Sequence, residues 1–151
     1  MTPKLSSRFS EYREFHTTRG NVLTHYIGIP LIATSVFGLF SMVTFGNEAF
    51  LPAVIRPDLG WALWFLALGF YLWLDWKIAL PFSLVMFGMY LIGRSLPFEV
   101  LIGMQVVGWI VQFYGHIRYE KKSPAFLKNG THMLVGPLWI FAKLIRYGDA
   151  K

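Results

Sequence analysis

The chain has 151 residues, of which 55% are hydrophobic and 15% are charged. A mean hydropathy of +0.48 excludes an ordinary soluble domain, because a chain this short cannot bury so much apolar surface in one core. The net charge of +6 does not indicate a nucleic-acid-binding protein, since the basic residues are spread between apolar segments and form no basic arm. We therefore expect residues 1–151 to form a single integral membrane domain in contact with membrane lipids.

Uncharged stretches of near-spanning length follow one another along the chain. A helix needs about 20 residues, at about 1.5 Å per residue, to cross a hydrocarbon layer of roughly 30 Å. Strand-like alternation is absent, so we expect an all-α polytopic membrane helical bundle. Four spanning helices are predicted, at residues 26–45, 59–74, 78–93 and 100–117.

Two segments of this series depart from a simple span. Residues 75–77, Asp-Trp-Lys, separate the two middle stretches, which predicts a tight helical hairpin. The last apolar run, residues 133–142, is shorter and contains Pro137. We expect it to form a re-entrant or interfacial helix, with a fifth span as the alternative.

The positive charges are distributed unequally between the two sides of this arrangement. Arg56 and Arg94 lie on one side, and the remaining Lys and Arg residues, of 14 in total, lie on the other. The positive-inside rule then places both termini, the hairpin tip and residues 118–132 in the cytoplasm. Compact loops and the lack of retention or transit signals favour a bacterial inner membrane, with the endoplasmic reticulum membrane as the alternative.

All four histidines, His16, His25, His116 and His132, fall on this cytoplasmic side near ends of predicted helices. The chain has no cysteine, and neutral imidazole binds iron, zinc, copper and nickel well, so we expect the four to be metal ligands. His16 and His25 would face opposite sides of one continuous helix, and Gly20 offers a break that would turn them toward each other. In the alternative interpretation they are solvated interfacial residues that cap helices and anchor headgroups.

Polar residues accompany the histidines at helical spacing. Asn21 and His25 are four residues apart, as are Gln112, His116 and Glu120, so each set shares one helix face. Polar groups in a membrane span usually face the bundle interior. We expect Asn21, Gln112 and Glu120 to support the catalytic site by orienting the imidazoles, with Glu120 as an alternative metal ligand.

Two separated motifs resemble a known family. The first is His16, four residues, Asn21, three residues and His25, followed by Ile-Gly-Ile-Pro. The second is Gln112, three residues, His116, three residues and Glu120, followed by Pro-Ala. Together they resemble the family of small polytopic membrane proteins that includes the yeast 2-hydroxy fatty acid dioxygenase of phytosphingosine breakdown and fatty acid α-oxidation.

This resemblance implies an Fe(2+)-dependent dioxygenase. Such an enzyme shortens a long-chain 2-hydroxy fatty acid by one carbon, using O2, releasing CO2 and needing no 2-oxoglutarate. The iron ligands implied by the resemblance are His16, His25 and His116, and His132 matches a further pattern in the family. The acyl chain would enter from the lipid and leave its carboxylate at the cytoplasmic face, where Arg19, Arg118 and Lys121 are candidates to bind it.

Two other functions stay open at this point. One is a zinc- or iron-dependent membrane enzyme that acts on another lipid. The other is a lipid-binding or assembly membrane protein without catalytic activity. The sequence does not determine the oligomeric state.

Overall fold

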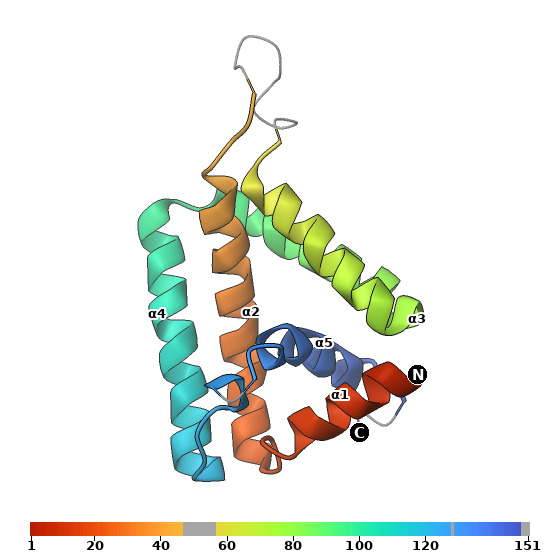
Figure 1. The fold of residues 1–151 in the computed structure, drawn as a ribbon. Coiled ribbons are helices and arrows are strands. Elements are labelled where there is room, and N and C mark those ends of the chain that lie inside the picture. Colours follow the sequence, from red (N-terminus) through yellow and green to blue (C-terminus); the bar gives the residue numbers. More distant parts are fainter. Residues whose placement is uncertain (47–56, 128, 149–151) are drawn as a thin grey trace.

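The computed structural model describes residues 1–46, 57–127 and 129–148 (Figure 1). Within these ranges the chain is helical apart from loops and one β-bridge between Thr44 and Asp58, which confirms the all-α class. Arg56, Lys128 and Lys151, which entered the charge argument, lie outside the described residues. The helices are α1 (Pro3–Arg13), α2 (Arg19–Ser41), α3 (Leu59–Ser95), α4 (Phe98–Gly115), the π-helical turn η1 (His116–Glu120), the short η2 (Ala125–Leu127) and α5 (His132–Leu144).

Three helical segments of the described chain are long and apolar enough to cross a membrane: α2, α3, and α4 continued by η1. The 37-residue α3 contains extended backbone at Asp75, with φ −163° and ψ 104°, and so consists of two arms. These arms correspond to the predicted spans 59–74 and 78–93, which confirms the helical hairpin. The short apolar α5 has 13 residues. The exact number of membrane crossings stays a prediction.

Close contacts between small residues hold α2 against its two long neighbours. A Cβ atom added to Gly38 of α2 would lie 2.6 Å from the carbonyl oxygen of Gly93 in α3. On the same helix, a Cβ added to Gly28 would lie 2.9 Å from the carbonyl oxygen of Gly108 in α4. Small residues that allow such backbone approach are typical of helix interfaces in membranes. The contact with α4 also brings the histidine-bearing ends of both helices together.

Helix α1 was not predicted as a helix from the sequence. It begins at Pro3, and the hydroxyl of Thr2 caps it by accepting a hydrogen bond from the Leu5 amide at 3.3 Å. One face is fully buried through Leu5 and Phe9. This burial supplies the stabilisation that a helix of 11 residues lacks in isolation. Helices α1 and α5 together cover the end of the bundle where α2 begins and α4 ends (Figure 1).

The two ends of the described chain are tied to the tip of the α3 hairpin. The buried carboxylate of Asp75 accepts a hydrogen bond from the Thr2 amide at 2.8 Å and another from the Tyr147 hydroxyl at 3.0 Å. Both termini and the hairpin tip therefore lie at the same end of the molecule as α1 and α5, which agrees with their predicted common side.

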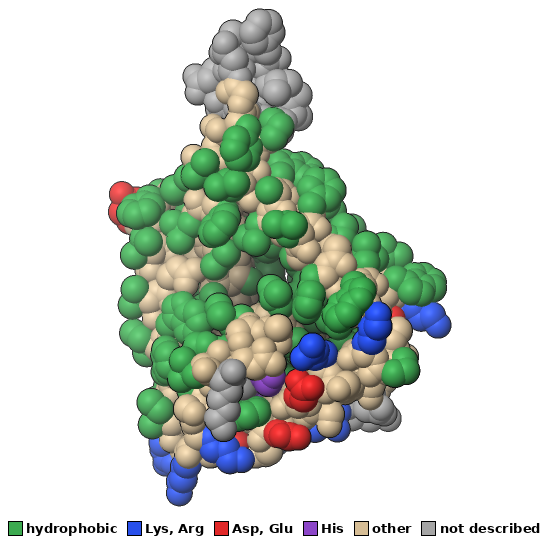
Figure 2. All heavy atoms as spheres, in the orientation of Figure 1, with side chains coloured by type: hydrophobic (Ala, Val, Ile, Leu, Met, Phe, Trp, Pro, Cys, Tyr) green, Lys and Arg blue, Asp and Glu red, His purple; other side chains and the backbone are tan. Residues whose placement is uncertain are grey.

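The surface separates into an apolar body and a charged end. Figure 2 shows hydrophobic side chains over α2, α3 and α4, and Lys and Arg side chains mainly where α1, η1 and α5 lie. Leu66, Leu84 and Ile110 are between 62% and 74% exposed, although they sit in the middle of long apolar helices. Exposed apolar residues over so much of the surface fit a lipid environment.

Candidate metal centre

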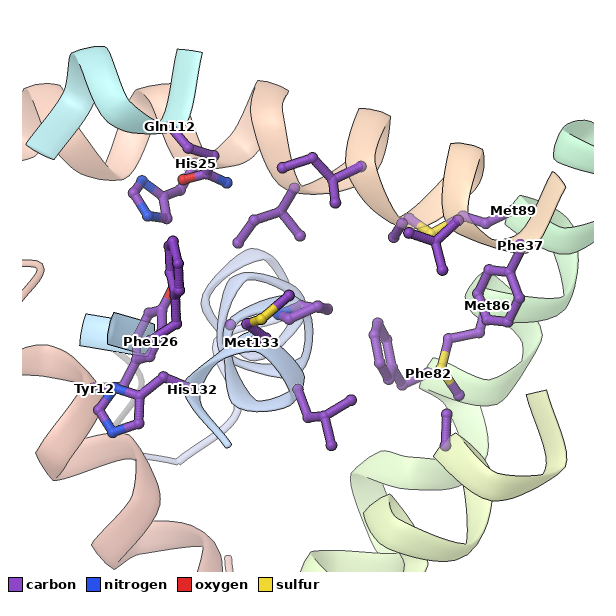
Figure 3. Close-up of a pocket in the computed structure, with 18 of the residues that line it drawn as sticks. Tyr12, His25, Phe37, Phe82, Met86, Met89, Gln112, Phe126, His132 and Met133 are labelled. Carbon is purple, nitrogen blue, oxygen red and sulfur yellow. The ribbon is translucent and has the colours of Figure 1, made fainter. Parts of the chain in front are cut away.

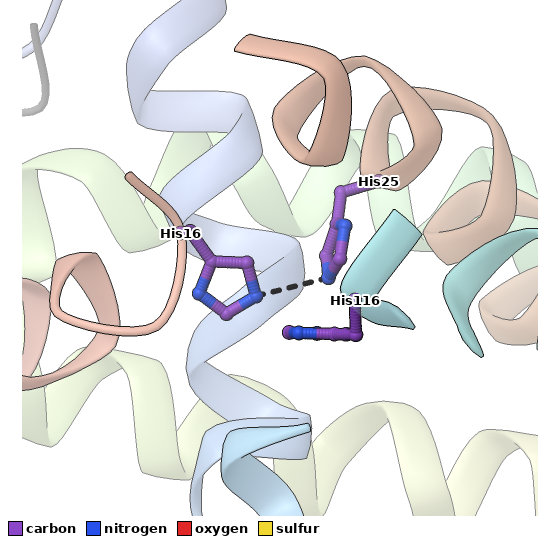
Figure 4. Close-up of side chains that lie close together, drawn as sticks. All are labelled: His16, His25 and His116. Atoms are coloured by element: carbon purple, nitrogen blue, oxygen red, sulfur yellow. Dashed lines mark hydrogen bonds between the residues drawn. The ribbon is translucent and has the colours of Figure 1, made fainter. Parts of the chain in front are cut away.

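Three histidine side chains from separate segments meet at the covered end of the bundle (Figure 4). His16 lies in the connection between α1 and α2, His25 lies in the second turn of α2, and His116 begins η1. One nitrogen of each ring lies within 4.8 Å of the others, and all three side chains are buried. The structure thus brings together three of the four histidines that were predicted to be metal ligands, and their binding of a metal stays a prediction.

Backbone carbonyl groups determine the tautomer of two of these rings. Nδ1 of His16 lies 2.7 Å from the carbonyl oxygen of Tyr12, and Nδ1 of His25 lies 2.8 Å from that of Asn21. A carbonyl oxygen only accepts hydrogen bonds, so each Nδ1 carries the ring proton and donates it. The Nε2 atom of each neutral ring is therefore an unprotonated lone-pair donor.

These two Nε2 atoms face each other at 2.9 Å. Two lone pairs at this distance repel each other unless a cation lies beside both. A proton does not serve at neutral pH, because burial, with repulsion from His25, lowers the pKa of His16 from 6.5 to about 2. The third ring offers a further nitrogen that could bind a metal, since Nδ1 of His116 is buried and has no hydrogen-bond partner within the described ranges. The donor set therefore fits a metal ion that prefers imidazole.

Glu120 joins the end of η1 to the beginning of α2. One carboxylate oxygen accepts a hydrogen bond from the Thr17 hydroxyl at 2.9 Å. The other accepts from the amide of Thr18 at 2.7 Å, its hydroxyl at 3.0 Å and the Asn21 amide nitrogen at 3.3 Å. The carboxylate is thus used for positioning, because it connects the segment that follows His16 to the turn that carries His116. Glu120 is not among the residues whose donor atoms cluster.

The turn between His16 and His25 differs from the one expected at Gly20. Helix α1 ends at Arg13 and α2 begins at Arg19, with Thr18 as its N-cap, so Gly20 lies inside the first turn of α2. The prediction of a break at Gly20 was wrong, because the helix already begins after Thr18, two residues earlier. The Thr18 hydroxyl accepts a hydrogen bond from the Asn21 amide, and Glu120 accepts one from the Thr18 amide. The absence of a side chain at Gly20 instead admits the ring of Tyr119.

His132 lies near the three histidines but outside their group. Its side chain is 6% exposed, and its Nε2 lies 3.8 Å from a carboxylate oxygen of Glu11. Its Nδ1 has no hydrogen-bond partner in the part of the chain that the structure describes. The ring of Tyr12 stacks on His16 at 3.9 Å and also contacts His132 at 5.8 Å. A role of His132 as a metal ligand stays a prediction.

A largely apolar cavity extends from the histidines into the bundle. At one end lie Tyr12, His25, Gln112 and His132, and at the other end lie Phe37, Phe82, Met86 and Met89 (Figure 3). The wall comes from α2, α3, α4 and α5, and Figure 2 shows a hollow on this face bordered by hydrophobic side chains. An elongated apolar space with polar groups at one end suits an amphiphile with one long chain.

His16 also lines a second cavity, and of the three cations predicted to bind the carboxylate only one lines it. Arg19 lines this cavity together with Arg13 and Lys143. Arg118 and Lys121 are exposed and line neither cavity.

Comparison with known proteins agrees with the two sequence motifs. The family model described as "2-hydroxy-palmitic acid dioxygenase Mpo1-like" matches residues 2–147. The chain belongs to this family. The Mpo1-like match runs from α1 to the end of α5 and therefore includes every element that forms the histidine group.

The chain matches one characterised relative but no solved structure. The chain is 29% identical over 133 residues to the 2-hydroxy-palmitic acid dioxygenase MPO1 of Saccharomyces cerevisiae, which covers 87% of this chain and 73% of the yeast protein. No solved structure gives a significant match. The resemblance to the dioxygenase family stated from the sequence is confirmed.

Sequence reasoning missed several residues of this site. Tyr12 supplies both a stacking ring and a carbonyl group to His16, and its four-residue spacing from His16 was the signal that could have indicated this contact. Thr17 and Thr18 were identifiable in part, because a Thr pair before a helical segment is a typical N-cap signal. Their joint hydrogen bonding to Glu120, about a hundred residues later, depends on the tertiary fold.

Proposed function

We propose that this chain is an Fe(2+)-dependent dioxygenase that shortens long-chain 2-hydroxy fatty acids by one carbon. The observation that carries the proposal is the pair of facing Nε2 atoms of His16 and His25, with His116 beside them, at the polar end of an elongated apolar cavity. Membership of a family described by a 2-hydroxy-palmitic acid dioxygenase supports the substrate class.

The proposed reaction balances without a further reductant. A 2-hydroxy acid, RCH(OH)COOH, and O2 yield RCOOH, CO2 and H2O. The bond between C1 and C2 breaks, C1 leaves as CO2, and C2 becomes the new carboxyl carbon. Oxidation of these two carbons releases four electrons, which is the number that one O2 molecule accepts when it is fully reduced. This stoichiometry agrees with a reaction that needs no 2-oxoglutarate.

In this proposal the residues of the chain have separate tasks. His16, His25 and His116 hold the iron, which supplies the O2-activating chemistry when bound. The carbonyl groups of Tyr12 and Asn21 keep the Nδ1 protons in place and so direct both Nε2 atoms to the metal.

Two further parts of the site complete the assignment. Glu120 fixes the relative position of the segments after His16 and around His116 through its hydrogen bonds to Thr17 and Thr18. The apolar cavity holds the acyl chain, excludes water from it and places its polar head beside the histidines.

We also propose that the histidine end of the bundle faces the cytoplasm of a bacterium, with the endoplasmic reticulum membrane as the alternative. The described Lys and Arg residues other than Arg94 lie on α1, η1 or α5, just after η1 or α5, at the start of α2 or at the hairpin tip. The positive-inside rule supports this orientation.

Turnover with a defined substrate tests the function directly. Purified protein loaded with Fe(2+) is incubated with 2-hydroxypalmitate and O2, and pentadecanoate and CO2 are measured. We expect equal amounts of both products, and palmitate, which lacks the 2-hydroxyl group, is the matched control. Loading with iron but no pentadecanoate would reject this substrate, and zinc as the retained metal would favour a different membrane enzyme.

Metal analysis of variants tests the site separately from turnover. His25→Ala and His116→Ala each remove one donor of the group, so each is expected to bind iron well below one equivalent while its helical circular dichroism is unchanged. His132→Ala distinguishes a three-histidine site from a four-histidine site, because it loses iron only in the second case. Full iron retention in both of the first two variants contradicts the site.

A further inference from the structure

The second cavity is a cationic vestibule, which we define by Arg13, Arg19, Lys143, Trp139 and Thr17. Its cations come from three elements: the end of α1, the start of α2 and the end of α5. His16 lines both this vestibule and the apolar cavity, so the two spaces adjoin at the histidine group. None of the residues that line the vestibule is acidic.

One residue of the vestibule wall carries a buried hydrogen-bond donor without an acceptor in the described part of the chain. Trp139 is 1% exposed, and its Nε1 has no hydrogen-bond partner among the described residues. An unpaired buried donor of this kind is costly, and native proteins rarely leave one without a partner. Trp139 packs against His16 at 5.8 Å and carries the Lys143 ammonium group 4.7 Å from the centre of its ring. The ring of Trp139 therefore lies beside both the histidine group and a cation.

The positive charges in the vestibule also favour a hydrogen-bond acceptor that carries a negative charge. Lys143 is half-buried, and burial, followed by the nearby charge of Arg13, lowers its pKa. An anion placed between Lys143 and Arg13 offsets the repulsion between their positive charges and accepts hydrogen bonds from both side chains. The surroundings of Lys143 and the unpaired indole group of Trp139 are independent observations that point to the same kind of ligand.

We propose that the vestibule of Arg13, Arg19, Lys143 and Trp139 binds the carboxylate of a fatty acid whose chain lies in the apolar cavity. This rests on the proposed function for the identity of the chain. The carboxylate sits where the two cavities meet at His16, so C1 lies toward the cations and C2 beside the histidine group. The vestibule thereby fixes the direction in which the substrate enters.

A fatty acid fits better than other anions because of the shape of the space. A free inorganic anion would have no use for the adjoining apolar cavity, whose lining is almost entirely hydrophobic over α2 and α3. A phospholipid carries two chains, whereas the cavity ends in one group of side chains that includes Phe37, Phe82 and Met86 (Figure 3). One chain with one terminal carboxylate satisfies both cavities together.

The experiment compares an acid with its uncharged ester on the full-length protein in phosphatidylcholine nanodiscs. Palmitate and methyl palmitate are titrated by calorimetry into wild type, Arg19→Met, Lys143→Met and Trp139→Phe. The exposed Lys122→Met is the matched control, since it removes a cation that lines neither cavity. Circular dichroism verifies that each variant retains its helical content.

We expect palmitate to bind about threefold to tenfold more weakly to Arg19→Met and Lys143→Met, and about threefold more weakly to Trp139→Phe. Methyl palmitate should change by less than twofold in all variants, and Lys122→Met should match wild type. Equal weakening of acid and ester overturns the proposal, because it indicates a packing defect. Unchanged palmitate binding in all three site variants also overturns it.

Failure of this inference is separable from failure of the proposed function. Palmitate lacks the 2-hydroxyl group, so its binding reports on the vestibule whether or not turnover occurs. Charge-dependent palmitate binding without pentadecanoate formation keeps the vestibule and rejects the reaction. Turnover with palmitate binding that is independent of these residues keeps the reaction and rejects the vestibule.

Discussion

The length of the apolar cavity predicts which fatty acids fit. His25 and Phe37 lie on the same helix, 12 residues apart (37 − 25 = 12), and line opposite ends of the cavity. At about 1.5 Å per residue they are separated by about 18 Å along the axis. An extended alkyl chain advances about 1.3 Å per carbon, given C–C bonds of about 1.5 Å in staggered geometry. The cavity therefore accommodates about 14 carbons beyond C2, as in a 16-carbon acid.

Removing a side chain from the far end of the cavity should increase the length of the longest fatty acid that fits. Phe37→Ala removes a ring that is 6% exposed and lines the far end of the cavity. We expect space for about two to three further methylene groups. Each additional buried methylene contributes about 0.8 kcal/mol, or about fourfold in affinity. The preferred substrate should thus change from about 16 carbons to about 18 or 19.

The assay is the ratio of kcat/KM for 2-hydroxy acids of 12 to 22 carbons, measured on the same protein preparation. In wild type, kcat/KM should rise about fourfold per methylene up to about 16 carbons and then level off. Phe40→Ala is the matched control, because Phe40 lies on the same helix but is 45% exposed and lines neither cavity. Met86→Ala, at the same end of the cavity, provides a second test if Phe37→Ala unfolds. An unchanged optimum in both wall variants, or an equal change in Phe40→Ala, refutes the reasoning.

Three further predictions concern pH, positioning and orientation. Below pH 6.5 the unfolded chain binds a proton at His16 that the folded, metal-free protein does not, so stability should fall by up to about 1.4 kcal/mol per pH unit as the pH decreases. Urea unfolding between pH 6.5 and 5 measures this slope, and a slope that persists undiminished in His16→Gln argues against it. Glu120→Gln keeps the size of the side chain but weakens its contacts with Thr18, so iron affinity should fall about tenfold or more without loss of helix, as iron competition with a chelator would reveal. Since the chain has no cysteine, a single Cys at exposed Lys122 should react with an impermeant maleimide in inside-out vesicles and not in intact cells; the reverse pattern inverts the proposed topology.

The helical hairpin shows how far local patterns extend. Uncharged runs on both sides of residues 75–77 sufficed to predict two helices with a sharp turn, and α3 has this form. The same reasoning placed the first span at residues 26–45, whereas α2 begins at Arg19, because the cap that starts it includes a carboxylate from Glu120. Hydropathy detects the apolar part of a helix, but it does not detect a polar first turn that is stabilised by a distant residue.

The histidine site was likewise predictable from the sequence only in part. The sequence placed four imidazoles at one end of a bundle, since charge and hydropathy determine which helix ends share a side of the membrane. It did not separate His132 from the group of three, and it did not show that Arg19, unlike Arg118 and Lys121, lines a cavity beside His16. Those distinctions depend on differences of a few ångströms in where the side chains lie, which helical periodicity alone does not resolve.

The sequence by itself determined the all-α membrane class, the order of the apolar helices and the histidines worth testing, because each follows from composition or from short local spacing. Its two motifs also carried the resemblance to the family. Only the tertiary structure decided that Nε2 of His16 faces Nε2 of His25 at 2.9 Å, with both Nδ1 atoms bonded to carbonyl groups. Only the tertiary structure also brought Lys143 and Trp139 of α5 beside His16. These contacts join residues from α1, α2 and α5, and such neighbours arise from packing of whole helices rather than from any local pattern.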